Sequence, residues 1–292
     1  MIPAEIIKKI KRIHIKGSRT VNTMMAGQYK SVFKGSGIEF EEVRDYSPGD
    51  DVKAIDWKVS ARLGKPFVKR YREERESIVM LLVDMSRSLH FGTFSGMKLE
   101  KAAEVASVLA FSAIKNNDKV GVLFFTDRVE KYIPPKKGAS HVWRLIKEIF
   151  TFEPCGKGTD LVAALEYLSS VSRKRTFSFI ISDFISHDPA KALRTASRRH
   201  ELIGVLISDK GEFCLPEKGF VYLTCFETGR KLLLDASSKT VQKFYTDRKN
   251  IHYSKVMECL KSSKIDCIEI STQDSVSDTL TRYFNYREKK MR

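Results

Sequence analysis

Hydrophobic positions along this chain follow two patterns: short unbroken apolar runs, and longer stretches in which apolar residues recur at helical spacing. The runs are bounded by polar residues, which is typical of strands buried on both faces of a parallel sheet. These strands are expected at 78–84, 119–125, 176–181 and 202–207, with a short edge strand at 129–133. Helices are expected at about 98–116, at 139–150, from about 160, and near 189–199. The alternation predicts an α/β domain with a mostly parallel central sheet covered by helices on both faces.

The two ends of the chain depart from this alternation. Residues 1 to about 20 predict a basic amphipathic helix, with Ile6, Ile10 and Ile13 on one stripe. Such a helix could lie on an anionic membrane, although we favour docking of its Ile stripe on the chain's own domain. The tail predicts a hairpin at 220–236, a long polar helix at 238–261, a strand within 264–272 and a closing helix at 276–286.

Residues 35–76 form a second unusual region, in which Gly and Pro punctuate short extended pieces and predict hairpin-like strands and turns. An acidic run comes first and a basic run follows. The acidic residues are Glu39, Glu41, Glu42, Asp45, Asp50, Asp51 and Asp56, and the basic ones are Lys58, Arg62, Lys65, Lys69, Arg70, Arg72 and Arg75. Trp57 and Phe67 are expected to act as apolar anchors. The segment either forms ion pairs that hold it on the main domain or offers a docking surface to a partner.

The formal net charge of +16 and the isoelectric point near 9.6 favour anionic partners such as nucleic acid, a membrane surface or an acidic protein face. The sequence contains no zinc finger or RNA-recognition signature, so no specific nucleic acid is expected. No run approaches the roughly 18 apolar residues of a membrane span, and the N-terminus lacks the features of a signal peptide. Five scattered cysteines are typical of reduced thiols. We therefore expect a cytoplasmic protein, which the basic N-terminal helix could hold at the inner face of the membrane.

Oxygen-bearing side chains follow the ends of two core strands. Asp84, Ser86 and Ser88 lie where the first core strand ends, and Asp183 follows a later one. Thr159 lies in a Gly-rich turn before a helix. Because the carboxyl ends of parallel strands meet at one edge of a sheet, we expect these side chains to lie together. Their oxygens are hard ligands that suit Mg²⁺ or Mn²⁺, with water or an outside carboxylate completing the octahedron. The alternative for the first loop is a Ser-rich turn that caps the next helix.

This arrangement resembles the metal-ion-dependent adhesion site of von Willebrand factor A domains, whose pattern is Asp-x-Ser-x-Ser, then Thr, then Asp. All five positions match, at Asp84, Ser86, Ser88, Thr159 and Asp183. The resemblance implies that the serines and the threonine contact the metal directly or nearly so, and that the aspartates act partly through water. A Glu or Asp of a partner protein would take the open position. His90 follows the motif, where a surface or capping role is more common than a ligand role.

The stretch 34–76 is similar to the signature of the bacterial family labelled domain of unknown function 58 (DUF58), whose members join it to an A-type domain. The similarity extends from residue 26 to the final helix. It implies a three-layer, Rossmann-type domain at 77–292, with the N-terminal helix and the family segment at 1–76 packed on this core. Members are commonly encoded beside MoxR-type AAA+ ATPases. The resemblance therefore implies such an ATPase, or its client protein, as the partner.

Enzymatic function finds little support in the motifs. A lipase-type Gly-x-Ser-x-Gly, a P-loop and a dinucleotide-binding Gly-x-Gly-x-x-Gly are absent. Metal-assisted hydrolysis is the one enzyme class left open, because an accessible Mg²⁺ could polarise a phosphate, but no obvious general base stands near. We expect a non-enzymatic, metal-dependent protein-binding module; the alternative is a charge-driven binder of nucleic acid or anionic membrane. Asp183→Ala is predicted to weaken metal-dependent binding and to leave the fold intact.

Overall fold

The computed structural model describes residues 37–291 apart from four gaps, at 75–76, 94–95, 214 and 225–229. The basic helix predicted over residues 1 to 20 lies outside the described residues. The chain divides into two compact units, and the division falls between Ser77 and Ile78. Packing of the family segment on the main domain stays a prediction.

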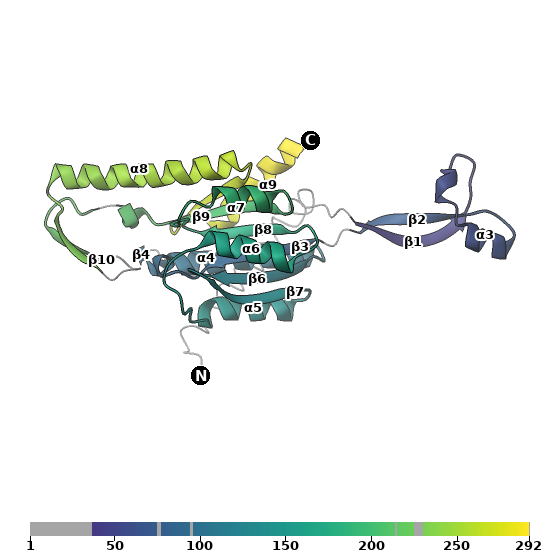
Figure 1. The fold of residues 1–292 in the computed structure, drawn as a ribbon, viewed down its shortest axis with the longest axis horizontal. Coiled ribbons are helices and arrows are strands. Elements are labelled where there is room, and N and C mark those ends of the chain that lie inside the picture. The colour runs from purple at the N-terminus through teal and green to yellow at the C-terminus, as the bar shows by residue number, and fades with distance from the viewer. Residues whose placement is uncertain (1–36, 75–76, 94–95, 214, 225–229, 292) are drawn as a thin grey trace. The chain divides into compact units, whose positions relative to one another are not determined.

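A six-stranded sheet forms the centre of the larger unit, in the strand order β12-β9-β8-β3-β6-β7 (Figure 1). Neighbouring strands are parallel except β7, which pairs antiparallel with β6 at one edge. The strands are β3 (Ile78–Asp84), β6 (Lys119–Phe125), β7 (Val129–Lys136), β8 (Phe177–Ser182), β9 (Glu201–Ser208) and β12 (Asp266–Ser271). The three central strands β8, β3 and β6 are buried along almost their whole length. The predicted mostly parallel sheet with an edge strand is confirmed, and the antiparallel direction of β7 is an addition.

Helices cover both faces of this sheet, which confirms the predicted three-layer architecture. One face carries α6 (Leu161–Val171), α7 (Ala190–Ser197) and α8 (Lys239–Ser262), and the other carries α4 (Lys98–Lys115), α5 (Ala139–Thr151) and α9 (Val276–Met291). Leu82 of β3 and its register partner Leu123 of β6 belong to the core beneath α6, α7 and α8. Their apolar neighbours Leu81 and Val122 point to the opposite face, because side chains alternate along a strand. The core therefore has two layers, one on each side of the sheet.

The smaller unit is an antiparallel ribbon of β1 (Gly37–Asp45) and β2 (Phe67–Glu74). The segment between the strands contains a 3-10 turn, η2 (Val52–Ala54), and a short helix, α3 (Trp57–Leu63). Asp56 caps α3 by accepting hydrogen bonds from Lys58 N and Val59 N, at 3.0 and 3.3 Å. The hairpin-like strands predicted for this segment are confirmed, and the helix between them is an addition.

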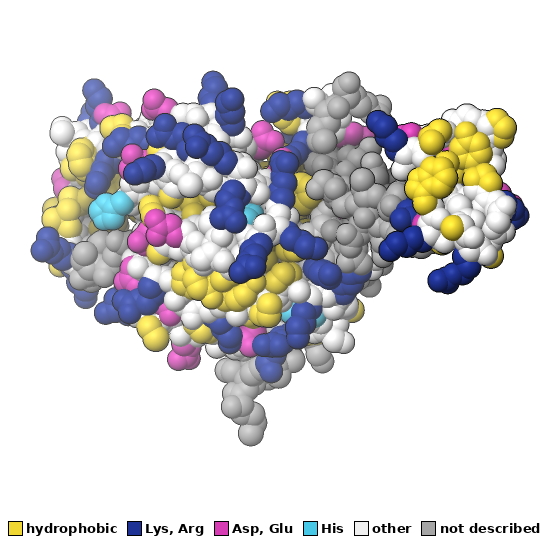
Figure 2. Space-filling view, turned by 45° about the vertical axis from the view of Figure 1, so that its right-hand side comes forward, with side chains coloured by type: hydrophobic (Ala, Val, Ile, Leu, Met, Phe, Trp, Pro, Cys, Tyr) yellow, Lys and Arg dark blue, Asp and Glu magenta, His cyan; other side chains and the backbone are white. Residues whose placement is uncertain are grey.

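Ion pairs link neighbouring parts of this smaller unit. Arg44 makes a two-pronged pair with Asp50, with N–O distances of 2.7 and 2.9 Å. The expectation that Trp57 anchors the segment is not met within the unit, where its side chain is 67% exposed. Helix α3 meets β2 through Ser60, whose Oγ accepts a hydrogen bond from Phe67 N at 2.8 Å. Figure 2 shows hydrophobic side chains gathered on the surface of this unit, so the apolar residues here are not all used in its own packing.

The tail of the chain adds the predicted elements in the predicted order. A two-stranded hairpin of β10 (Phe220–Thr224) and β11 (Lys231–Asp235) precedes the long helix α8. Only the C-terminal half of α8 reaches the core, through Val256 and Leu260. Among the described helices, none combines the length and the apolar composition that a membrane span requires.

Candidate functional site

Asp84 and Asp183 lie at the same edge of the sheet, where two parallel neighbours end. Asp84 is the last residue of β3 and Asp183 follows β8, and the register pairs Val83 with Ile181. Both carboxylates are buried. Burial, together with the negative charge of Asp183, raises the pKa of Asp84 to about 7, because both effects disfavour the ionised form. A positive charge at this edge would stabilise the ionised pair.

The loop after β3 brings two hydroxyl groups together. Ser86 N donates a hydrogen bond to Asp84 Oδ1 at 2.8 Å, and Ser86 Oγ lies 2.9 Å from Ser88 Oγ. The other carboxylate oxygen of Asp84 accepts from Ser182 Oγ at 2.5 Å. Ser86 immediately precedes the 3-10 helix η3 (Arg87–His90), but its side chain makes no capping hydrogen bond. The alternative of a helix-capping serine is therefore not met for η3, and the Ser86 hydroxyl pairs with Ser88 instead.

Thr159 belongs to the loop between α5 and α6, which is joined to the serine loop by a hydrogen bond from Arg87 N to Lys157 O at 3.2 Å. The neighbouring Asp160 caps α6, accepting from backbone N–H groups at 2.9 and 3.2 Å. Thr159 itself is buried, and its Oγ1 has no hydrogen-bond partner among the described residues. A buried hydroxyl without a partner costs about 1–3 kcal/mol. The structure thus brings four of the five predicted residues to one edge and joins the loop of the fifth to it.

Lys98 is a site residue that the sequence did not indicate. It is the first residue of α4, its side chain is fully buried, and its Nζ lies 2.8 Å from Asp183 Oδ2 and 2.6 Å from Glu212 Oε1. Burial lowers the pKa of Lys98, but the two carboxylates outweigh burial and hold the pKa above its usual range. A lysine is almost never fully buried unless it is paired. Lys98 is therefore a built-in cation of this edge, held by Asp183 and by Glu212 from the turn η4 (Lys210–Phe213).

The role of Asp183 is constrained by these contacts. One carboxylate oxygen accepts from Lys98 Nζ, and the other accepts from Ile185 N at 3.2 Å. Both Asp183 oxygens are thus engaged by the protein, as are both oxygens of Asp84. The hydroxyl groups have fewer contacts, since Ser86 Oγ and Ser88 Oγ pair with each other and Thr159 Oγ1 has no partner among the described residues.

Asp209 resembles Asp84 and Asp183 in position, since it follows β9 at the same edge, but its contacts are structural. Its carboxylate accepts hydrogen bonds from Thr93 Oγ1, Gly211 N and Thr272 Oγ1, the last at 2.6 Å. Burial raises the pKa of Asp209, but these hydrogen bonds outweigh burial and leave the pKa below its usual value. Asp209 therefore joins three segments of chain and is satisfied as a carboxylate.

The donor set suits a hard divalent cation. Two serine hydroxyls and two carboxylates lie at one edge, and Thr159 lies in the loop that is hydrogen-bonded to the serine loop. Oxygen ligands with remaining positions filled by water are what Mg²⁺ prefers. Within the described residues no group of three or more His, Cys, Asp or Glu side chains could hold a metal, so the hydroxyls are indispensable to any such site. His90 is exposed at the end of η3.

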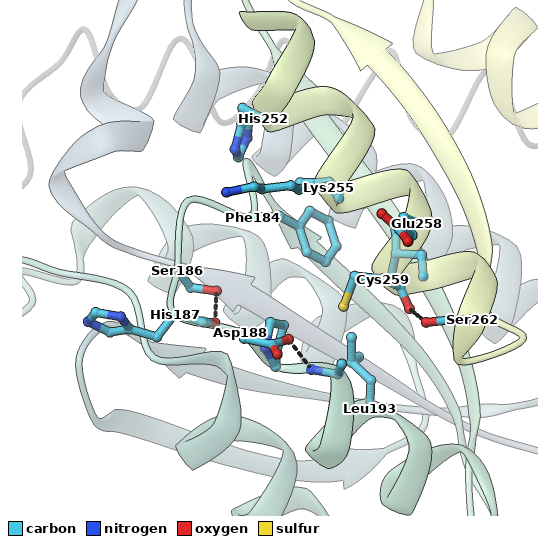
Figure 3. A pocket seen from close by; sticks show the side chains of 14 residues that line it. Phe184, Ser186, His187, Asp188, Leu193, His252, Lys255, Glu258, Cys259 and Ser262 are labelled. Carbon is cyan, nitrogen blue, oxygen red and sulfur yellow. Dashed lines mark hydrogen bonds between the residues drawn. The ribbon is translucent and has the colours of Figure 1, made fainter. Parts of the chain in front are cut away.

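Two cavities lined by described residues lie near Asp183. The larger, of about 670 Å³, is formed by α7, α8 and the loop after β8, with Phe184 and Cys259 in its lining and Lys255 at its polar side (Figure 3). The smaller, of about 290 Å³, is lined by Asp183 itself. His252 lines both cavities, and its Nε2 lies 3.1 Å from the backbone oxygen of Asp183. Room for side chains of a partner, or for a small ligand, therefore exists beside the carboxylate edge.

A family model described as "Protein of unknown function DUF58" matches residues 42–255. The chain belongs to the DUF58 family. The similarity to DUF58 seen in the sequence is thereby confirmed. The uncharacterized protein Rv1480 of Mycobacterium tuberculosis is 30% identical to this DUF58 protein over 223 residues, which are 75% of this chain and 70% of the relative. The uncharacterized protein YeaD of Bacillus subtilis is 28% identical over 107 residues, 37% of this chain and 25% of the relative.

Solved structures similar to this DUF58 protein have low sequence identity to it. The conserved hypothetical protein BatB of Bacteroides thetaiotaomicron has a TM-score of 0.48 and 14% identity, covering 73% of this chain and 99% of that chain. An aerotolerance-related membrane protein of Bacteroides fragilis has a TM-score of 0.49 and 18% identity, covering 74% of this chain and 100% of that chain. The SpRpn10 VWA domain has a TM-score of 0.41 and 10% identity, covering 70% of this chain and 94% of that chain. We draw nothing about function from similarity at this level.

Proposed function

We propose that this DUF58 protein is a non-enzymatic protein-binding module that holds a divalent metal ion, Mg²⁺ or Mn²⁺, at the carboxyl edge of its sheet. Ser86, Ser88 and Thr159 would hold the ion through their hydroxyl oxygens, and Asp84 and Asp183 would balance its charge, partly through water. The observation that carries this proposal is Thr159 Oγ1, a buried donor and acceptor with no partner among the described residues. When bound, the ion supplies positive charge and a coordination position that a partner's carboxylate completes.

The residues around the proposed ion site hold its carboxylates in place. Ser182 Oγ and Ser86 N fix both oxygens of Asp84, so its carboxylate cannot rotate freely. Lys98 neutralises part of the negative charge of Asp183 and Glu212, which limits the repulsion among the buried carboxylates of this edge. The carboxylates beside the hydroxyl groups are therefore held in place, which is the preorganisation that a selective ion site requires.

The partner in this proposal is a protein that presents an exposed Glu or Asp. A MoxR-type AAA+ ATPase, or a client of that ATPase, is our specific candidate, and it rests on the family resemblance alone. The competing proposal is a charge-driven binder of nucleic acid or anionic membrane, which the net charge of +16 supports. The two differ in sensitivity to chelator at fixed salt.

Direct metal binding is the first test. The full chain is titrated with Mn²⁺, followed by calorimetry and by the paramagnetic signal of the free ion. Thr159→Val removes the hydroxyl and keeps the shape, and we expect it to weaken Mn²⁺ binding at least tenfold. Thr281→Val is the matched control, because Thr281 Oγ1 is also buried with no partner in the described part of the chain, but lies on α9. Equal Mn²⁺ affinity in the wild type and Thr159→Val would refute the site.

Partner binding is the second test. Purified protein is used to capture partners from native extract in Mg²⁺ or in chelator, with Thr159→Val in parallel. A protein retained only in Mg²⁺, and only by the wild type, would support the adhesion-site mechanism. Retention in both conditions that declines steeply with salt would support the charge-driven alternative. The structure changes our expectation for Asp183→Ala: its loss leaves Lys98 with one carboxylate partner, so we now expect that variant to lose stability as well.

A further inference from the structure

The β10–β11 hairpin and the first half of α8 form an exposed arm, which we define as residues 218–224 and 230–250. In Figure 1 the hairpin lies beside the N-terminal end of α8, beyond the end of the central sheet. Residues 246–250 of α8 are all exposed, in contrast to the buried Val256 and Leu260 further along the helix. The arm is fixed at its base by Ala236, whose N donates to Gly219 O at 2.8 Å and whose O accepts from Gln242 Nε2 at 2.9 Å.

Large apolar side chains are exposed on the hairpin, three of them on one face and one on the other. Phe220 and Tyr222 are 75% and 73% exposed, and the register places Leu233 opposite Tyr222 on the same face. Leu232 is also exposed, and it points to the other face, because successive residues of a strand alternate. A protein partner that covered one face of this ribbon would leave the other face in water.

The arm is also strongly basic. Its described residues include seven Lys and Arg but only two Asp and Glu. Its five lysines form no ion pair in the described part of the chain, and all are exposed: Lys218, Lys231, Lys239, Lys243 and Lys249. Arg248 lies over the ring of the exposed Phe244, at 5.6 Å from its centroid. Exposed aromatic and aliphatic side chains interleaved with unpaired cations therefore extend from the hairpin into α8.

We propose that this arm binds the surface of an anionic lipid membrane. The apolar side chains of the hairpin enter the interfacial layer, where lipid can surround both faces of the ribbon at once. The lysines of the arm contact lipid phosphates, since each basic residue near an anionic surface contributes about 1 kcal/mol, roughly a fivefold gain in affinity. Insertion is shallow, because the open edges of a two-stranded ribbon need water or headgroups as hydrogen-bond partners. The proposal is independent of the metal site and predicts binding that is insensitive to chelator.

Co-sedimentation of the full chain with lipid vesicles tests the proposal. We expect binding to vesicles of phosphatidylcholine mixed with phosphatidylglycerol, and at least tenfold weaker binding to phosphatidylcholine alone. The triple variant Lys231→Glu/Lys239→Glu/Lys243→Glu is expected to weaken binding to the mixed vesicles at least tenfold. Removal of the apolar surface, as Phe220→Ser/Tyr222→Ser, is expected to weaken it several-fold.

Matched controls separate the arm from the rest of the surface. Lys174→Glu reverses an exposed charge outside the arm, and Tyr286→Ser removes an exposed aromatic ring from α9; both are expected to bind as the wild type does. Circular dichroism verifies that each variant is folded. Absence of binding to the mixed vesicles would overturn the proposal. So would unchanged binding by the arm variants with loss in Lys8→Glu/Lys9→Glu, because that result assigns the affinity to the N-terminal segment.

Discussion

If Lys98 is replaced by Met, Asp183 and Glu212 lose the cation that they share. The contacts measure 2.8 and 2.6 Å, and the lysine side chain is fully buried. At an effective dielectric constant of about 20, Coulomb's law gives roughly 6 kcal/mol for each contact. Desolvation of the ammonium group offsets a large part of this sum, and removal of one partner from a buried ion pair costs about 3–5 kcal/mol. We expect Lys98→Met to lower the free energy of unfolding of the larger unit by that amount.

Urea denaturation followed by far-ultraviolet circular dichroism measures this loss. Lys147→Met is the control, because Lys147 is exposed on α5 and its replacement is expected to change the free energy of unfolding by less than about 0.5 kcal/mol. Glu212→Gln provides a milder change that keeps the pair between Lys98 and Asp183. We expect it to lower the free energy of unfolding by about 1–3 kcal/mol.

A second readout distinguishes a charge effect from loss of packing alone. Lys98→Met removes one positive charge beside the proposed ion site, so added Mg²⁺ is expected to raise its unfolding midpoint more than that of Lys147→Met. The double variant Lys98→Met/Glu212→Gln is expected to recover part of the lost stability, because one uncompensated carboxylate is removed with the lysine. A free energy of unfolding for Lys98→Met within about 1 kcal/mol of the wild type would refute the reasoning.

Two further predictions concern the threonine loop and the response to pH. A Cβ added at Gly156 would lie 2.1 Å from Thr126 Oγ1, so we expect Gly156→Ala to displace the loop, to lower the free energy of unfolding by about 1–3 kcal/mol and to weaken Mn²⁺ binding. Burial, with the charge of Arg199, lowers the pKa of His200 in the folded protein. The neutral, buried His200 therefore contributes to stability above the unfolded pKa of about 6.5, and this contribution is lost as the pH falls below about 6.5. Between about pH 7.5 and pH 5, His200→Asn is therefore expected to lose less free energy of unfolding than the wild type.

The controls for both predictions come from neighbouring or similar residues. Gly158→Ala places its Cβ no nearer than 3.8 Å to another atom, and it is expected to leave Mn²⁺ affinity unchanged; an equal loss in both glycine variants would contradict the steric argument. His187→Asn changes an exposed histidine and is expected to keep the wild-type pH response, as measured by urea denaturation at each pH. The raised pKa of Asp84 makes the folded protein more stable as the pH falls. The quantity to compare is therefore the change in the free energy of unfolding with pH in each variant against that in the wild type.

Much of the larger unit could be predicted because its strands carry a strong local signal. The side chains of an unbroken apolar run such as 78–83 are all removed from water only when both faces of the strand are covered. The polar residues at the ends of such runs therefore had to lie at one edge of the sheet, and Asp84, Ser86, Ser88 and Asp183 do so. The helix α3 was missed because a seven-residue segment has too few turns to show a period.

The pairing of Lys98 could not be read from the sequence. It contacts residues 85 and 114 positions away, and a lysine at the start of a helix is normally solvated. Its burial depends on how the turn η4 closes over the start of α4, which no local pattern encodes. That Thr159 Oγ1 has no partner among the described residues could not be predicted from the sequence either, because it depends on every atom packed around the loop.

The sequence by itself determined which residues could supply oxygen ligands, in which order the strands and helices follow, and that the chain carries a large positive charge. Local composition settles these matters, since apolar periodicity and residue type act over a few positions. The tertiary structure alone decided which charges are buried together, which buried hydroxyls lack a partner among the described residues, and which apolar side chains stay exposed on the hairpin. Those properties depend on distances between segments far apart in the chain, and they are what the proposed metal site and the proposed membrane arm rest upon.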